Sequence, residues 1–158
     1  METRERSVES GVDDREASRR AEECLYGYRL NLSRLRTLRG RLGLLEASPS
    51  NRGVSYERYG GGVPGDPVAK RMERIDRLER QIAELESRTE PITRMLEDLR
   101  EDYGLESSRS RELFQLLELR YFAGGTWPEI AVKLGVSETA LKRRRRHLLR
   151  LAMDYFCL

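Results

Sequence analysis

The sequence predicts an all-α fold in which a long coiled-coil helical hairpin is followed by a C-terminal three-helix domain. Charged residues make up 36% of the 158 residues and aromatic residues only 7%. This composition is typical of long, solvated helices rather than of a thick globular core. Apolar residues also recur at three- and four-residue steps along most of the chain, which is the period of a helix with one buried face.

The first helix is expected between Ser18 and Glu46. Before it, residues 1–17 carry many charges and almost no large apolar side chains, so we predict a disordered tail there. Five arginines lie between Arg29 and Arg41 without an acidic residue among them. We interpret them as a solvated helix face rather than as a second nucleic-acid contact. The apolar face of this helix comprises Leu25, Tyr28, Leu32, Leu35 and Leu42.

Residues 48–67 separate the first helix from the second. Their three prolines and five glycines exclude a helix and predict a flexible loop. The glycines at 60–62 lack the Gly-Lys-Ser/Thr ending of a phosphate-binding loop, so that interpretation is not favoured.

The second helix should run from Pro67 to Gly104, which makes residues 18–104 a helical hairpin. Pro91 cannot donate to the carbonyl of Ser87, so we expect a kink or a break there. An amphipathic helix cannot bury its apolar seam alone. We therefore expect it to fold back on the first helix and to form a homodimer through the coiled coil. The seam comprises Ile75, Leu78, Ile82, Leu85, Ile92, Leu96, Leu99 and Tyr103, with Thr89 in one position.

Residues 105–158 are predicted to end in a helix-turn-helix. Thr126 can cap the first helix of the pair, with Glu129 three residues later in capping-box spacing. Gly135 is suited to a left-handed helix end, and Ser137 can cap the following helix. Two short helices joined by a tight turn that contains glycine are the signature of this motif.

The last helix has an apolar side and a cationic side. Leu148, Ala152 and Tyr155 fall on the same side as Leu141 when the helix is projected at about 100° per residue. An outward-facing arginine on such a helix can bond guanine in the major groove, and other cations can bind phosphates. We therefore predict that helix 138–153 reads double-stranded DNA. The predicted contacts are Ser137, Thr139, Lys142, Arg143, Arg146, His147 and Arg150.

The charge distribution agrees with this prediction. Residues 105–158 hold ten Lys and Arg against six Asp and Glu, a net charge of +4, whereas residues 1–104 have a net charge of −1. A positive excess in the DNA-binding part is the expected electrostatic footprint.

A family resemblance adds to this interpretation. The last third of the chain resembles the C-terminal, region-four DNA-binding module of bacterial sigma factors, and still more the small phage and prophage transcription regulators of the ArpU-like and RinA-like kind. The resemblance implies a phage or prophage transcription regulator that binds promoter DNA, with RNA polymerase as a further partner. Arg144 departs from it, since such modules usually place an apolar residue there. The matching residues are Leu119, Arg120, Tyr121, Phe122, Gly124, Thr126, Trp127, Ile130, Ala131, Leu134, Ser137, Leu141 and Leu148.

Other classes of function find little support in the sequence. It contains no metalloprotease, nucleophile-elbow or dinucleotide motif, so we expect no enzyme and no cofactor. Cys24 and Cys157 stand far apart and His147 is the only histidine, so we expect no metal site and a reducing cytoplasm. No apolar run approaches the roughly 18 residues of a membrane span, so no membrane partner is expected. Trp127 is expected in the core rather than in a ligand site.

Two alternatives stay open at this stage. A small terminase-like phage packaging subunit also joins a helix-turn-helix to an oligomerising coiled coil. A coiled-coil scaffold whose basic helix meets an acidic protein would explain the charge without DNA. The mass in solution and binding to duplex DNA at low salt discriminate among these classes.

Overall fold

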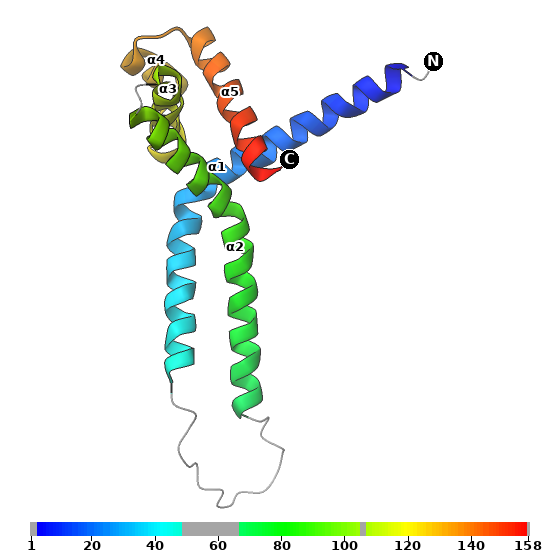
Figure 1. Cartoon of the computed structure of the whole chain (residues 1–158), viewed down its shortest axis with the longest axis vertical. Coiled ribbons are helices and arrows are strands. Elements are labelled where there is room, and N and C mark those ends of the chain that lie inside the picture. The colour runs from blue at the N-terminus through cyan, green and yellow to red at the C-terminus, as the bar shows by residue number, and fades with distance from the viewer. Residues whose placement is uncertain (1–2, 49–66, 105–106, 158) are drawn as a thin grey trace, which may run out of the picture. The chain divides into compact units, whose positions relative to one another are not determined.

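The computed structural model describes residues 3–48, 67–104 and 107–157, and these ranges contain helices and no strand. The predicted all-α class is therefore confirmed (Figure 1). None of the described helices combines the length and the apolarity that crossing a bilayer requires. The elements are α1 (Thr3–Ala47), α2 (Pro67–Gly104), α3 (Ser108–Leu116), the π-helix η1 (Leu117–Phe122), α4 (Trp127–Leu134) and α5 (Glu138–Phe156).

α1 begins at Thr3 rather than near Ser18, so the predicted disordered tail is helical over most of its length. The physical reason is that a helix extends at no further nucleation cost once its apolar part has formed, and Arg and Glu are good helix formers. One i,i+4 ion pair supports this part of the helix, with 2.7 Å between Arg20 Nη2 and Glu16 Oε1. The predicted loop at 48–67 falls almost entirely on residues outside the described ranges.

The chain divides into two compact units, residues 31–87 and residues 1–30 together with 88–158. This division differs from the predicted boundary between residues 104 and 105. The reason is that the adjoining ends of α1 and α2 supply much of the core of the larger unit. Its buried apolar residues include Ala21, Leu25 and Tyr28 of α1, Ile92, Met95, Leu96 and Leu99 of α2, and Leu113, Leu116, Leu148 and Leu149 from α3 and α5.

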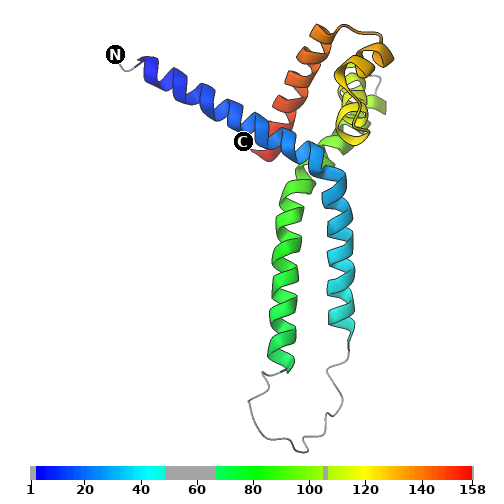
Figure 2. The ribbon, with the colours of Figure 1, turned by 180° about the vertical axis from the view of Figure 1, so that it is seen from behind.

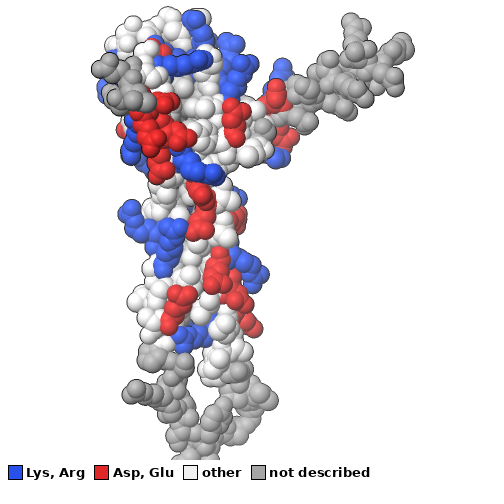
Figure 3. All heavy atoms as spheres, viewed as in Figure 1, with Lys and Arg blue, Asp and Glu red and all other residues white. Residues whose placement is uncertain are grey.

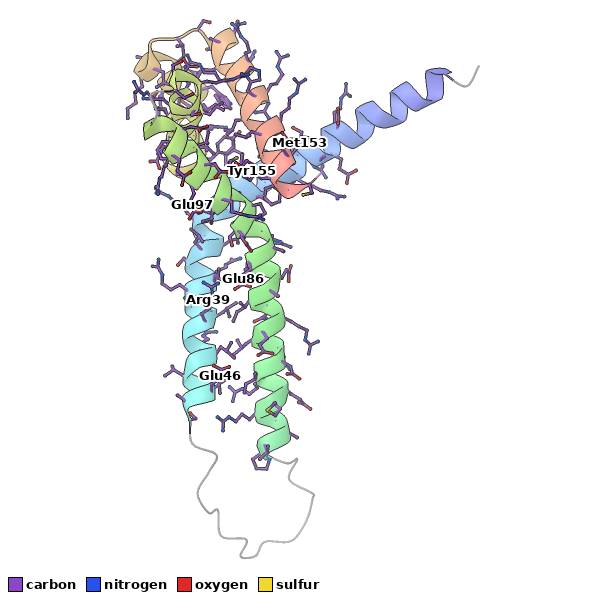
Figure 4. All side chains as sticks on the ribbon, viewed as in Figure 1. Arg39, Glu46, Glu86, Glu97, Met153 and Tyr155 are labelled. Carbon is purple, nitrogen blue, oxygen red and sulfur yellow. The ribbon has the colours of Figure 1, made fainter. Side chains whose placement is uncertain are left out.

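The smaller unit is an antiparallel pair of helical segments from α1 and α2, which lie side by side in both ribbon views (Figures 1 and 2). Arg39 Nη2 donates to Glu86 Oε1 at 2.6 Å, and the two side chains face each other in Figure 4. Arg71 Nη2 donates to the carbonyl of Ser48 at 2.7 Å. Leu35 and Ile82 are buried between the segments, whereas other residues of the predicted seam, Ile75, Leu78 and Leu85, are only half-buried.

Two backbone features shape the larger unit. α2 continues as one helix through Pro91, so the predicted break does not occur, and the predicted kink stays a prediction. α3 passes directly into η1, in which the Ala123 N–H donates to the Glu118 carbonyl at 2.8 Å in a widened turn. π-helical turns of this kind occur often at functional sites. Here the turn carries Arg120 and Tyr121, whose side chains contact residues of α1 in the same unit.

Candidate DNA-binding surface

The helix-turn-helix forms as its local signals predict. Thr126 Oγ1 accepts from the Glu129 N–H and the Glu129 carboxylate accepts from the Thr126 N–H, which completes the capping box. The hydrogen bond from the Thr126 backbone lowers the pKa of Glu129. Gly135 ends α4 with φ of 63°, and Ser137 Oγ accepts from the Ala140 N–H at 3.2 Å. The turn between α4 and α5 is thus fixed by residues within it.

Apolar contacts hold α5 against the rest of the larger unit. Leu141, Leu148 and Ala152 are buried as predicted, together with Ile130 of α4. Leu149 is also buried, although the projection did not include it. Tyr155 is half-buried rather than buried, and its hydroxyl donates to the Asp98 carboxylate of α2. The orientation of α5 is therefore set by one apolar side and one tyrosine at its end.

The opposite side of α5 presents the predicted DNA contacts to solvent. Figure 3 shows Lys and Arg side chains gathered over this helix. Within the described ranges the exposed cations make no hydrogen bond or ion pair with protein groups. His147 differs, because it is half-buried and lies beside Arg109 of α3. The exposed predicted contacts are Ser137, Thr139, Lys142, Arg143, Arg146 and Arg150.

Comparison with known proteins agrees with this geometry. The family model described as ECF sigma factor matches residues 51–154, which is about two thirds of the chain and includes α2, α4 and α5 up to Asp154. The chain belongs to the ECF sigma factor family. Membership indicates a DNA-binding role in transcription and confirms the predicted likeness to sigma factors. Searches of the curated proteins and of the solved structures found no match.

Two arginines of this ECF sigma factor's basic run, neither of them among the predicted DNA contacts, form ion pairs inside the protein that the sequence did not predict. Arg144, at the position where an apolar residue was expected, is largely buried and lies 3.0 Å from a carboxylate oxygen of Glu112 on α3. Arg145 donates from Nε and Nη2 to both carboxylate oxygens of Glu22 on α1. The side of α5 that carries them faces α1 and α3, so only the remaining cations are available to DNA.

The Glu22 carboxylate also accepts a hydrogen bond from Tyr121, at 2.9 Å between Oη and Oε1. Burial raises the pKa of Glu22, but the hydrogen bonds from Arg145 and Tyr121 outweigh it, so the net pKa lies below its ordinary value of 4.5. The pKa of Tyr121 is raised by burial and by the neighbouring carboxylate. One acidic residue of α1 thus joins η1 to α5 in this member of the family.

Trp127 is half-buried, which corrects the prediction that it belongs to the core. The reason is that Arg120 occupies the space beside it, with its guanidinium carbon 4.7 Å from the indole centroid and 5.6 Å from the Tyr26 ring centroid. Arg120 Nη1 donates to the Gly125 carbonyl at 2.8 Å. The indole therefore packs against a cation at the start of α4.

Proposed function

We propose that the chain is a sequence-specific transcription regulator that binds promoter DNA with α5 in the major groove. The observation that carries this proposal is the exposed side of α5, where Thr139, Arg143, Arg146 and Arg150 point away from Leu141 and Leu148 without protein partners in the described ranges. The second helix of a helix-turn-helix reads base edges mainly with its N-terminal part. Thr139 and Arg143 are therefore assigned to bases, and Arg150 to the phosphate backbone.

RNA polymerase is the proposed protein partner, as the likeness to sigma factor region four implies. A groove of about 590 Å³ in the larger unit is lined by residues of α2, α3, η1 and α4, and α5 contributes none of them. Its lining includes Phe114, Leu119 and Leu134 with Arg100 and Lys133 at the edges. An amphipathic helix of a partner fits such a groove. Because α5 does not line this groove, the groove would stay accessible while α5 binds DNA. Co-purification of polymerase with the DNA-bound chain tests this contact.

A homodimer formed through the coiled coil is the proposed oligomer. Ile75, Leu78 and Leu85 of α2 remain half-buried in the two-helix unit, and a second copy would complete their burial. Two copies would bring two α5 helices to half-sites separated by whole turns of DNA. The mass in solution tests this, since a large ring would favour the packaging subunit instead. We also propose that the chain is encoded by a phage or prophage and is related to the ArpU-like or RinA-like regulators.

The experiment that tests the function is selection of bound sequences from random duplex DNA by the full chain. Recovery of a shared sequence is expected, and Arg143→Ala combined with Arg146→Ala should abolish its enrichment. Arg74→Ala combined with Arg77→Ala, which removes two exposed cations of α2 in the smaller unit, is the matched control and should leave the enrichment intact. Absence of duplex binding even at low salt would contradict the proposal and favour an acidic protein partner.

A further inference from the structure

Two cross-helix contacts in register join α3 to α5. Arg109 Nη2 lies 3.2 Å from Nε2 of His147, and Glu112 lies 3.0 Å from Arg144. Each step of three residues forward along α3 is a step of three residues backward along α5, so the two helices are antiparallel. Leu116, four residues after Glu112, and Leu141, three residues before Arg144, are both buried. These contacts place Arg109 at a defined level beside the middle of α5.

That level coincides with the edge of the proposed DNA-binding side. On a helical projection of α5, His147 lies about 40° from Arg143 and about 60° from Arg150. Lys142 lies at the other edge of the same side. Because Arg109 is exposed and contacts His147, its guanidinium extends the cationic surface from α5 onto α3.

The pairing of Arg109 differs from that of the structural arginines nearby. Arg144 and Arg145 each have a carboxylate partner, Glu112 and Glu22. Arg109 has no carboxylate partner in the described ranges, and its only polar contact there is the ring of His147. No carboxylate of the described residues therefore neutralises its positive charge, and it lies at the edge of the side of α5 that carries the other exposed cations. A polyanion would relieve that repulsion.

We infer that Arg109 is a further contact to the phosphate backbone of duplex DNA and that His147 is the positioning residue that holds its guanidinium. This inference rests on the proposed function. A neutral imidazole has one acceptor nitrogen, which is Nε2 or Nδ1 depending on the tautomer. Arg109 Nη2 lies within hydrogen-bond distance of both ring nitrogens of His147, at 3.2 Å from Nε2 and 3.5 Å from Nδ1. One donor bonded to the ring leaves the other donors of the guanidinium fork for a phosphate. His147 then acts through Arg109 instead of contacting DNA itself.

Arg109→Gln tests the contact in the full-length chain, by fluorescence anisotropy with the selected duplex and with an unrelated one at several salt concentrations. Weaker binding to both duplexes is expected, and the salt slope of log K should fall by about one. Arg109→Lys keeps the charge and should retain the slope. Arg111→Gln is the matched control, since it removes the same charge about 200° away around α3 and should leave the slope unchanged.

The outcomes distinguish a failure of this inference from a failure of the proposed function. An unchanged slope in Arg109→Gln, with binding lost in the Arg143 and Arg146 double variant, overturns the inference and leaves the proposed function standing. Equal losses in the Arg109 and Arg111 variants also overturn it, because net charge alone would explain them. Unchanged binding in every variant contradicts the proposed function itself.

A double-mutant cycle tests the role of His147. If His147 acts through Arg109, His147→Ala should lower the slope as Arg109→Gln does, and the double variant should match Arg109→Gln alone. His147→Gln, which keeps an acceptor on a side chain of similar reach, should recover most of the wild-type slope. Additive losses in the double variant would show an independent role of His147 and overturn the positioning assignment. Helix content measured by circular dichroism identifies any variant that fails to fold.

Discussion

The carboxylate of Glu22 holds the guanidinium of Arg145 with two hydrogen bonds, across 123 positions of sequence. The Tyr121 hydroxyl donates to the same carboxylate. This contact ties α1 to both η1 and α5, so the segment that carries the proposed DNA-binding residues is held by a part of the chain far from it in sequence.

Glu22→Gln should destabilise the protein by about 1–3 kcal/mol, because it leaves a partly buried guanidinium without a charged partner. The expected loss of stability is modest because the Arg145 side chain is 38% exposed and solvent screens its ion pair with Glu22. Urea denaturation measures the free energy of unfolding. Glu23→Gln is the matched control, since its pair with Arg19 is 3.7 Å long and exposed. Equal effects of the two substitutions would contradict a special role of Glu22.

Stability should depend on pH through the same carboxylate. The pKa of Glu22 is lower in the folded protein than its ordinary value of 4.5, so the folded state binds its proton less readily than the unfolded chain. The contribution of this group is therefore fully present above pH 4.5 and is lost as the pH falls through the folded pKa. Thermal melts from about pH 6 down to about pH 3 should show a smaller decline for Glu22→Gln than for the wild type. Parallel declines in the two proteins would exclude this group as the cause.

Arg143 and Arg150 should differ in how their loss affects DNA binding. Arg143→Ala should cost about 1–3 kcal/mol and relax the preference at one base pair, if Arg143 bonds a base edge. Arg150→Ala, farther along α5, should weaken all sequences alike and lower the salt slope by about one. Binding titrations with single-base variants of the selected site measure both effects. A uniform loss from Arg143→Ala would contradict base readout by Arg143.

Trp127→Ala should destabilise the protein by about 2 kcal/mol, less than the 3–5 kcal/mol of a fully buried aromatic side chain. The indole is half-buried, and its contact with Arg120 contributes part of the loss. Trp127→Phe keeps an aromatic face over the guanidinium and should recover more than half of the stability. Trp127 is the only tryptophan, so its substitution removes the tryptophan fluorescence signal. Chemical denaturation monitored by circular dichroism therefore measures these values. A loss above about 4 kcal/mol would indicate a fully buried ring instead.

Alanine substitution at two glycines that have open space around them should change the free energy of unfolding in opposite directions. Gly135 has φ of 63°, so Gly135→Ala should cost about 1–2 kcal/mol and loosen the turn before α5. Gly43 lies inside α1 with nothing within 4 Å of an added Cβ, so Gly43→Ala should stabilise by about 0.5–1 kcal/mol. Thermal unfolding of the two variants checks the signs. Equal signs would contradict the left-handed conformation at Gly135.

The predictable part of the fold consists of features with local causes. The capping box of Thr126 and Glu129, the left-handed end at Gly135 and the cap at Ser137 depend on residues within four positions of each other. Their hydrogen bonds therefore follow directly from residue type and spacing. The sequence predicts too short a first helix, because the charges of residues 1–17 are also typical of a disordered tail. A long helix needs few apolar residues near its end once its nucleus has formed.

The ion pairs of the basic run were not predictable from spacing alone. The helical projection places Arg144 about 60° and Arg145 about 40° from Leu141, on the apolar side of α5. Glu112 and Glu22, which pair with these two arginines, come from other helices. Projection of α5 identified its apolar side, but it contained no information about acidic residues on α1 and α3.

The sequence by itself determined the helices, their caps, the turn between α4 and α5 and the apolar side of α5, because neighbouring residues within one or two helical turns specify each of them. The tertiary structure alone decided that Arg144 and Arg145 pair with Glu112 and Glu22, that Trp127 packs on Arg120 and that Arg109 joins the edge of the cationic surface. Those arrangements depend on which helices pack together, since a charged side chain points inward only where a distant partner compensates the loss of water.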